Sequence, residues 1–154
     1  MNAQTIRAFA ILVLLAAFTS HADEGVYVPD PLQSLHIEGR IRVDVFVDAS
    51  NLGSDAIEVA EITFYEDSSV AAPEEGGPHT HDSTEIFYVL EGELIHIVGD
   101  QKYVVRKGEV GIVGSGDVVR HGLETDAPVR ALVIWVPGGE VARLIRGGFT
   151  PVPE

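Results

Sequence analysis

The chain contains no cysteine among its 154 residues. This absence excludes disulfides, thiolate metal sites and cysteine nucleophiles, so any bound metal must be held by nitrogen and oxygen atoms. Basic residues are also scarce: 10 lysines and arginines face 24 acidic residues, which gives a formal net charge of −14. This large negative net charge argues against binding to nucleic acid or to anionic membranes, because both are themselves negatively charged.

Charge is almost missing from the first 22 residues, where Arg7 is the only charged side chain. An apolar run follows at residues 8–18, and Ser20-His21-Ala22 is a small-x-small site. These features are typical of a secretory signal peptide, and the run is shorter than the roughly 20 residues that span a bilayer. The alternative is a buried N-terminal helix or an uncleaved anchor, which the acidic residues 23–24 disfavour. We expect cleavage after Ala22, export to the periplasm or the medium, and no membrane span in the mature chain.

The mature chain, residues 23–154, has the length of a single domain and shows no internal repeat. Prolines make residues 23–34 an extended lead-in. Short stretches rich in Val and Ile then alternate with glycine-containing turns, which predicts an antiparallel all-β sandwich or barrel. The expected strands are residues 37–47, 57–65, 85–91, 93–98, 102–106, 109–113 and 128–136. Residues 141–145 show helical spacing and precede Gly147, which predicts one short C-terminal helix.

The stretch HTHDSTE holds two histidines and a glutamate. His79 and His81 are two residues apart, so on a strand both rings face the same side. Glu85 is too distant on a straight strand to share a metal with His79, because six residues of strand span roughly 20 Å. A turn at residues 82–84, whose small polar side chains favour one, would bring Glu85 opposite the histidines. The stretch therefore predicts a hairpin whose ligands converge across the turn.

His-x-His, three residues, Glu, six residues and Gly resembles the first motif of the cupin superfamily. The residues that match this motif are His79, His81, Glu85 and Gly92. The second motif of the family is matched in part, by Gly108 and Gly116, and His121 follows as the remaining histidine. The resemblance covers roughly residues 40–137. The closing Pro137-Gly138-Gly139 before a short helix is also similar to small quercetinase-like cupins with a single domain.

This resemblance implies a cupin fold, a small antiparallel barrel of the double-stranded β-helix (jelly-roll) type with a divalent metal at its mouth. The implied ligands are His79, His81, Glu85 and His121. Imidazole suits Fe, Ni and Zn whereas carboxylate suits Mn, so we expect one divalent transition metal of this group. Open coordination positions would serve water or substrate. Without a metal, the same residues would be exposed loop histidines and an ordinary strand acid.

His96 lies in a stretch, residues 93–98, that is apolar on both faces. If it points inward it lines the cavity and can act as an acid or base; otherwise it is a core histidine or part of a subunit contact. Glu85 and His96 are thus the candidate catalytic residues. Phe87 and Val89 share the parity of Glu85 and should line the interior, whereas Trp135 is expected in the core or at an interface.

Three functions fit these patterns. The first is an exported metal-dependent enzyme acting on a small organic molecule, either dioxygenase-like or a lyase, isomerase or decarboxylase. The second is a non-catalytic cupin that captures a metal or small ligand, and the third is a metal-free cupin similar to sugar epimerases. A fold does not fix a reaction, so the reaction class rests on the resemblance. Apolar residues on both faces of 93–98 and 131–136 also predict a homodimer.

Overall fold

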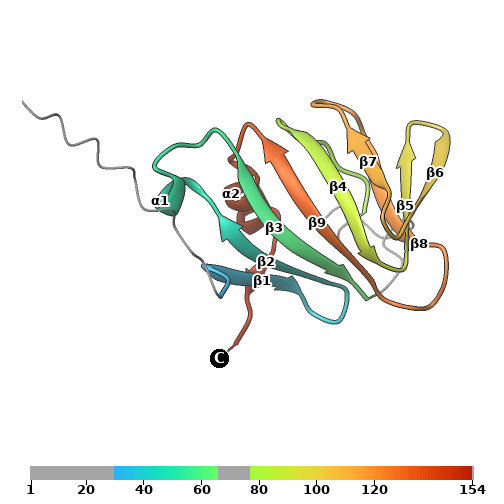
Figure 1. Ribbon diagram of the computed structural model, residues 1–154, viewed down its shortest axis with the longest axis horizontal. Coiled ribbons are helices and arrows are strands. Elements are labelled where there is room, and N and C mark those ends of the chain that lie inside the picture. The colour runs from blue at the N-terminus through green and yellow to red at the C-terminus, as the bar shows by residue number, and fades with distance from the viewer. Residues whose placement is uncertain (1–29, 66–76, 154) are drawn as a thin grey trace, which may run out of the picture.

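The computed structural model describes residues 30–65 and 77–153. Two antiparallel sheets make up the fold (Figure 1), with strand orders β10-β1-β2-β3-β9-β4-β7 and β6-β5-β8. The strands of the larger sheet are β1 (Gln33–Ile37), β2 (Ile41–Val47), β3 (Glu58–Phe64), β4 (Thr84–Glu91), β7 (Val110–Val113), β9 (Val129–Val136) and β10 (Thr150–Pro151). Those of the smaller sheet are β5 (Glu93–Val98), β6 (Gln101–Arg106) and β8 (Val119–Leu123). The expected antiparallel all-β cupin fold is confirmed.

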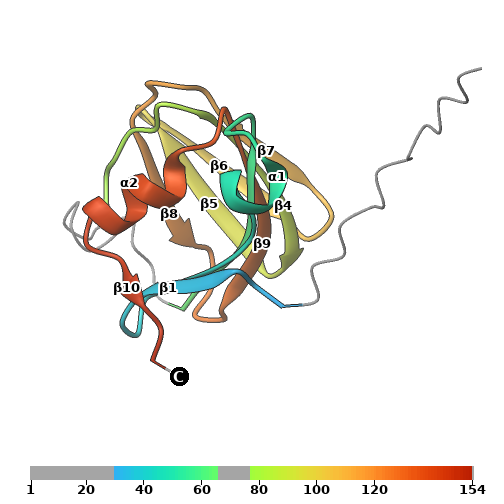
Figure 2. The ribbon, with the colours of Figure 1, turned by 90° about the vertical axis from the view of Figure 1, so that its left-hand side faces the viewer.

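In the described part of the chain, two short helices accompany the sheets, α1 (Ala49–Leu52) and α2 (Glu140–Arg146). Helix α2 is the expected C-terminal helix, and it buries Val141 and Leu144 in the hydrophobic core. It leads into β10, which lies along β1 (Figure 2). None of the helices in the described residues is both long enough and apolar enough to cross a membrane.

Buried and exposed side chains alternate along β4, so one face of this strand points to the interior and the other to the surface. Glu85, Phe87 and Val89 are fully buried, whereas Tyr88 between them is 44% exposed. Successive side chains of a strand point to opposite faces, so this pattern places the carboxylate and the two apolar residues on one inner face. The expected parity of β4 is therefore confirmed, and the inner face of this strand reaches both the core and the histidines.

The prediction of a single strand at residues 37–47 is wrong, because the chain reverses direction within this range. Strands β1 and β2 form a hairpin in which Ile37 pairs with Ile41, and Gly39 in the turn has a φ of 72°. Residues that pair across a hairpin lie on the same face of the sheet. The alternation of apolar residues thus continues through the turn, and the sequence pattern of a hairpin matches that of one long strand.

Three further elements depart from the sequence analysis. The connection between the strands expected at 37–47 and 57–65 contains α1, which Asp48 and Asn51 cap at its start. Strands β8 and β10 were not expected, since β8 reads VRHGL and has little of the β-branched character of a strand. The proposed signal peptide and most of the lead-in lie outside the described residues.

Gly92 forms the turn between β4 and β5 and requires the absence of a side chain. Its φ is 81°, and a Cβ there would lie 2.8 Å from Val129 Cγ2 and 3.0 Å from the carbonyl oxygen of Pro128. Only glycine adopts this conformation readily and also permits so close an approach. This glycine sets the position at which the chain leaves the larger sheet for the smaller one.

Candidate metal centre

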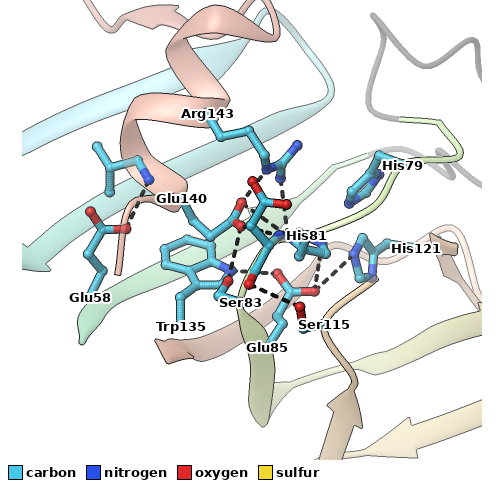
Figure 3. A network of polar contacts seen from close by, with 12 residues as sticks. Glu58, His79, His81, Ser83, Glu85, Ser115, His121, Trp135, Glu140 and Arg143 are labelled. Atoms are coloured by element: carbon cyan, nitrogen blue, oxygen red, sulfur yellow. Dashed lines mark hydrogen bonds and ion pairs between the residues drawn. The ribbon is translucent and has the colours of Figure 1, made fainter. Parts of the chain in front are cut away.

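The three imidazoles of the site come from two neighbouring segments. His79 forms an isolated bridge with Val119 at the start of β8, with N–H···O distances of 3.0 and 2.9 Å. His121 lies two residues further along β8, and His81 two residues beyond His79. One ring nitrogen from each histidine lies within 4.8 Å of the others. The three rings and the Glu85 carboxylate point toward one another (Figure 3).

The prediction of a hairpin around residues 82–84 is wrong. Strand β4, which carries Glu85, pairs with β7 and β9, whereas His79 pairs with Val119 beside the smaller sheet. The chain crosses from one sheet to the other between His81 and Glu85. The ligands therefore converge because two sheets face each other, and no local turn pairs their segments.

Glu85 is the acid at the centre of this cluster and is only 1% exposed. Its Oε1 accepts a hydrogen bond of 2.8 Å from Trp135 Nε1, and its Oε2 lies 3.1 Å from His81 Nε2 and 3.5 Å from His121 Nε2. Burial acts to raise the pKa of Glu85, but the two imidazoles outweigh it and hold the pKa well below its usual value. Glu85 is consequently an ionised carboxylate in the interior.

Two of the histidines are oriented by partners on their Nδ1 atoms. His79 Nδ1 lies 2.6 Å from the carbonyl oxygen of Gly77, which can only accept, so this nitrogen carries the proton. His81 Nδ1 lies 3.1 Å from Glu140 Oε2, a carboxylate that likewise accepts. With the proton placed on Nδ1, each ring can offer Nε2 to a metal, which binds this nitrogen in its unprotonated form.

Glu140, at the first position of α2, supports the site from outside. It is 2% exposed and accepts hydrogen bonds from Ser83 Oγ (3.0 Å) and the Asp82 backbone N–H (3.2 Å). Arg143, one turn along α2, pairs with the same carboxylate. Burial acts to raise the pKa of Glu140, but the bonds to His81 and Arg143 lower it to about 2.

The protonation of the two oriented rings differs in the absence of a metal. Burial lowers the pKa of His79 to about 3. Burial also acts to lower the pKa of His81, but the neighbouring carboxylates of Glu140 and Glu85 outweigh it and raise the pKa to about 9. His81 between two carboxylates therefore holds a positive charge, and a metal cation would replace its Nε2 proton.

A cavity of about 70 Å³ opens on this cluster. Its polar wall holds the three histidines, Glu85 and Arg143, and its apolar wall comes from β2, β3 and the C-terminal segment. The apolar lining residues are Ile41, Val43, Ile62, Phe64, Leu144 and Phe149. Trp135, expected in the core or at an interface, is buried and also fixes one oxygen of Glu85.

His96 points inward but does not reach this cavity. It is 2% exposed, and its ring centroid lies 4.9 Å from those of Phe87 and His121. It lines a second cavity of about 640 Å³ between β6 and β7. Since His121 lines the first cavity and His96 does not, His96 has no direct access to a molecule held there.

The donor set fits a divalent transition metal. His81 Nε2 and Glu85 Oε2 are buried and have no hydrogen-bond partner among the described residues. Buried polar atoms are nearly always satisfied, so this pair is compensated either by a proton on His81 Nε2 or by a metal ion that replaces it. Three imidazoles and a carboxylate match the nitrogen and oxygen preferences of Fe, Mn, Ni and Zn. His79, His81, Glu85 and His121 would hold the ion.

Sequence reasoning missed Glu140 and Arg143. They lie 59 and 62 positions after His81, so no local spacing connects them to the histidines. The one available signal was a glutamate and an arginine three residues apart on the short C-terminal helix, where both occupy one face. That signal alone describes an ordinary surface ion pair.

Comparison with known proteins agrees with this fold. Residues 68–135 match the family model described as "Cupin domain". This match confirms the resemblance to cupins that the motifs of the chain indicated. None of the curated proteins compared with the chain matches it.

Several solved structures share the fold. A predicted oxalate decarboxylase from Thermotoga maritima is 18% identical, with a TM-score of 0.58 over 73% of this chain and 99% of its own. KdgF from a Halomonas species is 16% identical, with a TM-score of 0.54 over 71% of this chain and 91% of its own. An RmlC-like cupin from Shewanella frigidimarina is also 16% identical, with a TM-score of 0.54 over 72% and 89%. At these identities the likeness concerns the fold.

Proposed function

We propose that the protein is an exported, divalent-metal-dependent cupin enzyme that acts on a small organic acid. One observation carries the proposal. His81 Nε2 and Glu85 Oε2 are buried 3.1 Å apart without a hydrogen-bond partner in the described structure, in a cavity that His79 and His121 also line. Such a set of atoms is costly to bury unless a cation satisfies it.

The residues around the cavity would have different roles in catalysis. A bound divalent metal supplies Lewis-acid polarisation of a substrate oxygen. Glu85 is the one carboxylate that lines the cavity within the described residues, so it is the group that can accept or return a proton there. Trp135 holds Oε1 of Glu85 and leaves Oε2, on the side of His81 and His121, for the metal or for a proton. Dioxygenase-like, decarboxylase, lyase and isomerase chemistry all remain open to such a site.

Charge and shape of the cavity favour a small anion with an apolar body. Arg143 is the basic side chain of the lining and pairs with Glu140, so a net positive charge in the cavity would come from a bound divalent metal. The whole chain carries −14, so a positive cavity stands out against a negative surface and attracts anions locally. Ile62 and Phe64 on the opposite wall would pack against the apolar part. A carboxylate with a short hydrocarbon or aromatic portion meets both requirements.

Metal or ligand binding without catalysis is the second candidate. Both oxygens of Glu85 already face partners, Trp135 on one side and two histidines on the other. His96, the other candidate acid or base, lies outside the cavity lining. A protein that only captures a metal or small ligand needs no free proton-transfer group, and this arrangement would serve it.

Turnover by metal-loaded protein separates the two candidates. Wild type, Glu85→Gln and the exposed control Glu38→Gln are each incubated with a panel of small organic acids, and products are followed by mass spectrometry. We expect turnover by wild type and Glu38→Gln and its loss in Glu85→Gln. Saturable binding with no product from any of the three proteins would replace the enzyme proposal with the binding one.

We also propose that the protein is a homodimer. Ile112 is 65% exposed and Val110 56% exposed on the outer face of the edge strand β7. They pair across the sheet with Ile86 and Tyr88 of β4 and form an apolar outer surface. A second copy covering this surface would remove it from water. Light scattering should give twice the chain mass for wild type and a monomer for Ile112→Glu; a wild-type monomer would refute the dimer.

A further inference from the structure

We propose that His96 is a positioning residue for the metal ligand His121. In the metal-loaded protein, the Nδ1–H group of His121 donates a hydrogen bond to His96 Nε2, which holds the His121 ring with Nε2 toward the metal. The inference rests on the metal site of the proposed function. It assigns His96 a role that acts through another residue, and it replaces the role of acid or base.

Two unsatisfied nitrogens motivate the assignment. His121 Nδ1 and His96 Nε2 are both buried, and neither has a hydrogen-bond partner among residues 30–65 and 77–153. Leaving a buried donor or acceptor unsatisfied costs about 1–3 kcal/mol. A donor on one ring and an acceptor on the other would satisfy both atoms at once, and neutral imidazole supplies one of each.

The other two histidines of the site show the arrangement that His121 lacks. His79 Nδ1 has the carbonyl oxygen of Gly77, and His81 Nδ1 has the carboxylate of Glu140. Histidines that bind metals nearly always donate their second ring N–H to such an acceptor, which fixes the tautomer and the orientation of the ring. His121 needs an acceptor on the same atom for the same reason.

The fold brings His96 to the required place. His96 on β5 is the direct cross-strand partner of His121 on β8. Their ring centroids are 4.9 Å apart, with the planes at 70°, so the edge of one ring meets the other. Leu94, two residues before His96, is also fully buried, so this face of β5 points inward.

The surroundings of His96 fit the tautomer that the proposal needs. If His96 Nε2 accepts a hydrogen bond, the proton of the neutral ring is on Nδ1. The Nδ1 side of the His96 ring lies against Gly111 of β7. A Cβ at position 111 would come within 3.0 Å of His96 Nδ1 and 2.9 Å of Cε1, so the glycine makes room for the ring. His96 also lines the cavity between β6 and β7, where water can accept a hydrogen bond from Nδ1.

Metal affinity tests the proposal with three variants. His96→Leu removes the acceptor and keeps an apolar side chain, His96→Gln offers an amide oxygen near the position of Nε2, and His36→Leu is a control on β1. Binding of Zn²⁺ is measured by competition with a chromogenic chelator, and folding is checked by thermal unfolding without metal. We expect His96→Leu to weaken Zn²⁺ binding by about 10- to 100-fold. His96→Gln should recover most of the loss, and His36→Leu should match wild type.

The tautomer gives a second readout that a purely structural role would not move. Nitrogen-15 NMR of the zinc-loaded protein should show the His121 proton on Nδ1 and an unprotonated Nε2 on His96. The inference is overturned if His96→Leu binds Zn²⁺ as tightly as wild type, if Gln and Leu lose equally, or if His96 carries its proton on Nε2. Wild type that fails to bind Zn²⁺ would overturn the metal site itself, which distinguishes the two failures.

Discussion

Glu140 Oε2 lies 3.1 Å from His81 Nδ1, although 59 positions separate the two residues in the chain. The contact connects the C-terminal helix α2 to the histidine cluster. It orients the His81 ring with Nε2 toward Glu85, His79 and His121, and Arg143 balances the charge of the buried carboxylate. Helix α2 is thus part of the metal site as well as part of the core.

Replacing Glu140 with glutamine should weaken metal binding. The amide keeps the volume of the side chain but accepts the Nδ1 proton of His81 less strongly, and partners of this kind are worth about 10- to 100-fold in affinity. The measurement is the Zn²⁺ dissociation constant of Glu140→Gln, with the exposed Glu38→Gln as its control. Equal affinities for Glu140→Gln and wild type would show that the His81 ring is oriented without this carboxylate.

Trp135→Phe should lower the free energy of unfolding by about 1.5–3 kcal/mol, because it removes the hydrogen bond from the indole to the ionised Glu85. Urea denaturation at pH 7 measures the loss. The smaller ring also leaves a gap, so a double-mutant cycle with Glu85→Gln isolates the hydrogen bond from the packing. Additive effects of the two substitutions would mean that the indole stabilises the core alone.

The stability of the metal-free protein should fall as the pH rises from neutral through about 9. His81 has a pKa raised to about 9, above its ordinary value of 6.5, so folding favours its protonated form. The resulting stabilisation is complete below pH 6.5 and disappears as the pH passes the folded-state value. Urea unfolding of wild type and His81→Gln between pH 6 and 10 checks this. The same slope in both proteins would exclude His81 as its source.

Gly92→Ala should destabilise the protein more than Gly39→Ala does. Both glycines have positive φ, 81° and 72°, but a Cβ at Gly92 clashes with Val129 and Pro128, whereas a Cβ at Gly39 has nothing within 4 Å. Gly39→Ala therefore measures the backbone strain, of about 1–3 kcal/mol, and the excess in Gly92→Ala measures the clash. Equal losses in chemical denaturation would show that the β4–β5 turn shifts freely to admit a side chain.

How much the sequence revealed depended on whether a feature was local. The alternation around Phe87 predicted the inner face of β4, and the spacing of His79, His81 and Glu85 predicted that they meet. The predicted cause, a turn that pairs their two segments, was wrong. The three residues meet because the two sheets pack against each other. Period-two patterns also pass unchanged through the β1–β2 hairpin, so they did not reveal its turn.

Contacts between side chains that lie far apart in the chain could not be predicted from the sequence. Glu140 and Arg143 reach His81 only after the chain has completed both sheets, and neither belongs to a motif with a fixed spacing. The partnership of His96 with His121 depends on the register of β5 and β8, and β8 itself was not recognised as a strand. Such contacts follow from strand order, which the pattern of apolar residues does not encode.

Metal content of the protein purified gently and without chelator tests the central claim most directly. Elemental analysis of wild type, His81→Gln and Glu85→Gln should give close to one equivalent of a divalent transition metal per chain for wild type and far less for both variants. Wild type that is folded yet carries no stoichiometric metal, and takes up none when metals are added, would contradict the account and favour a metal-free cupin.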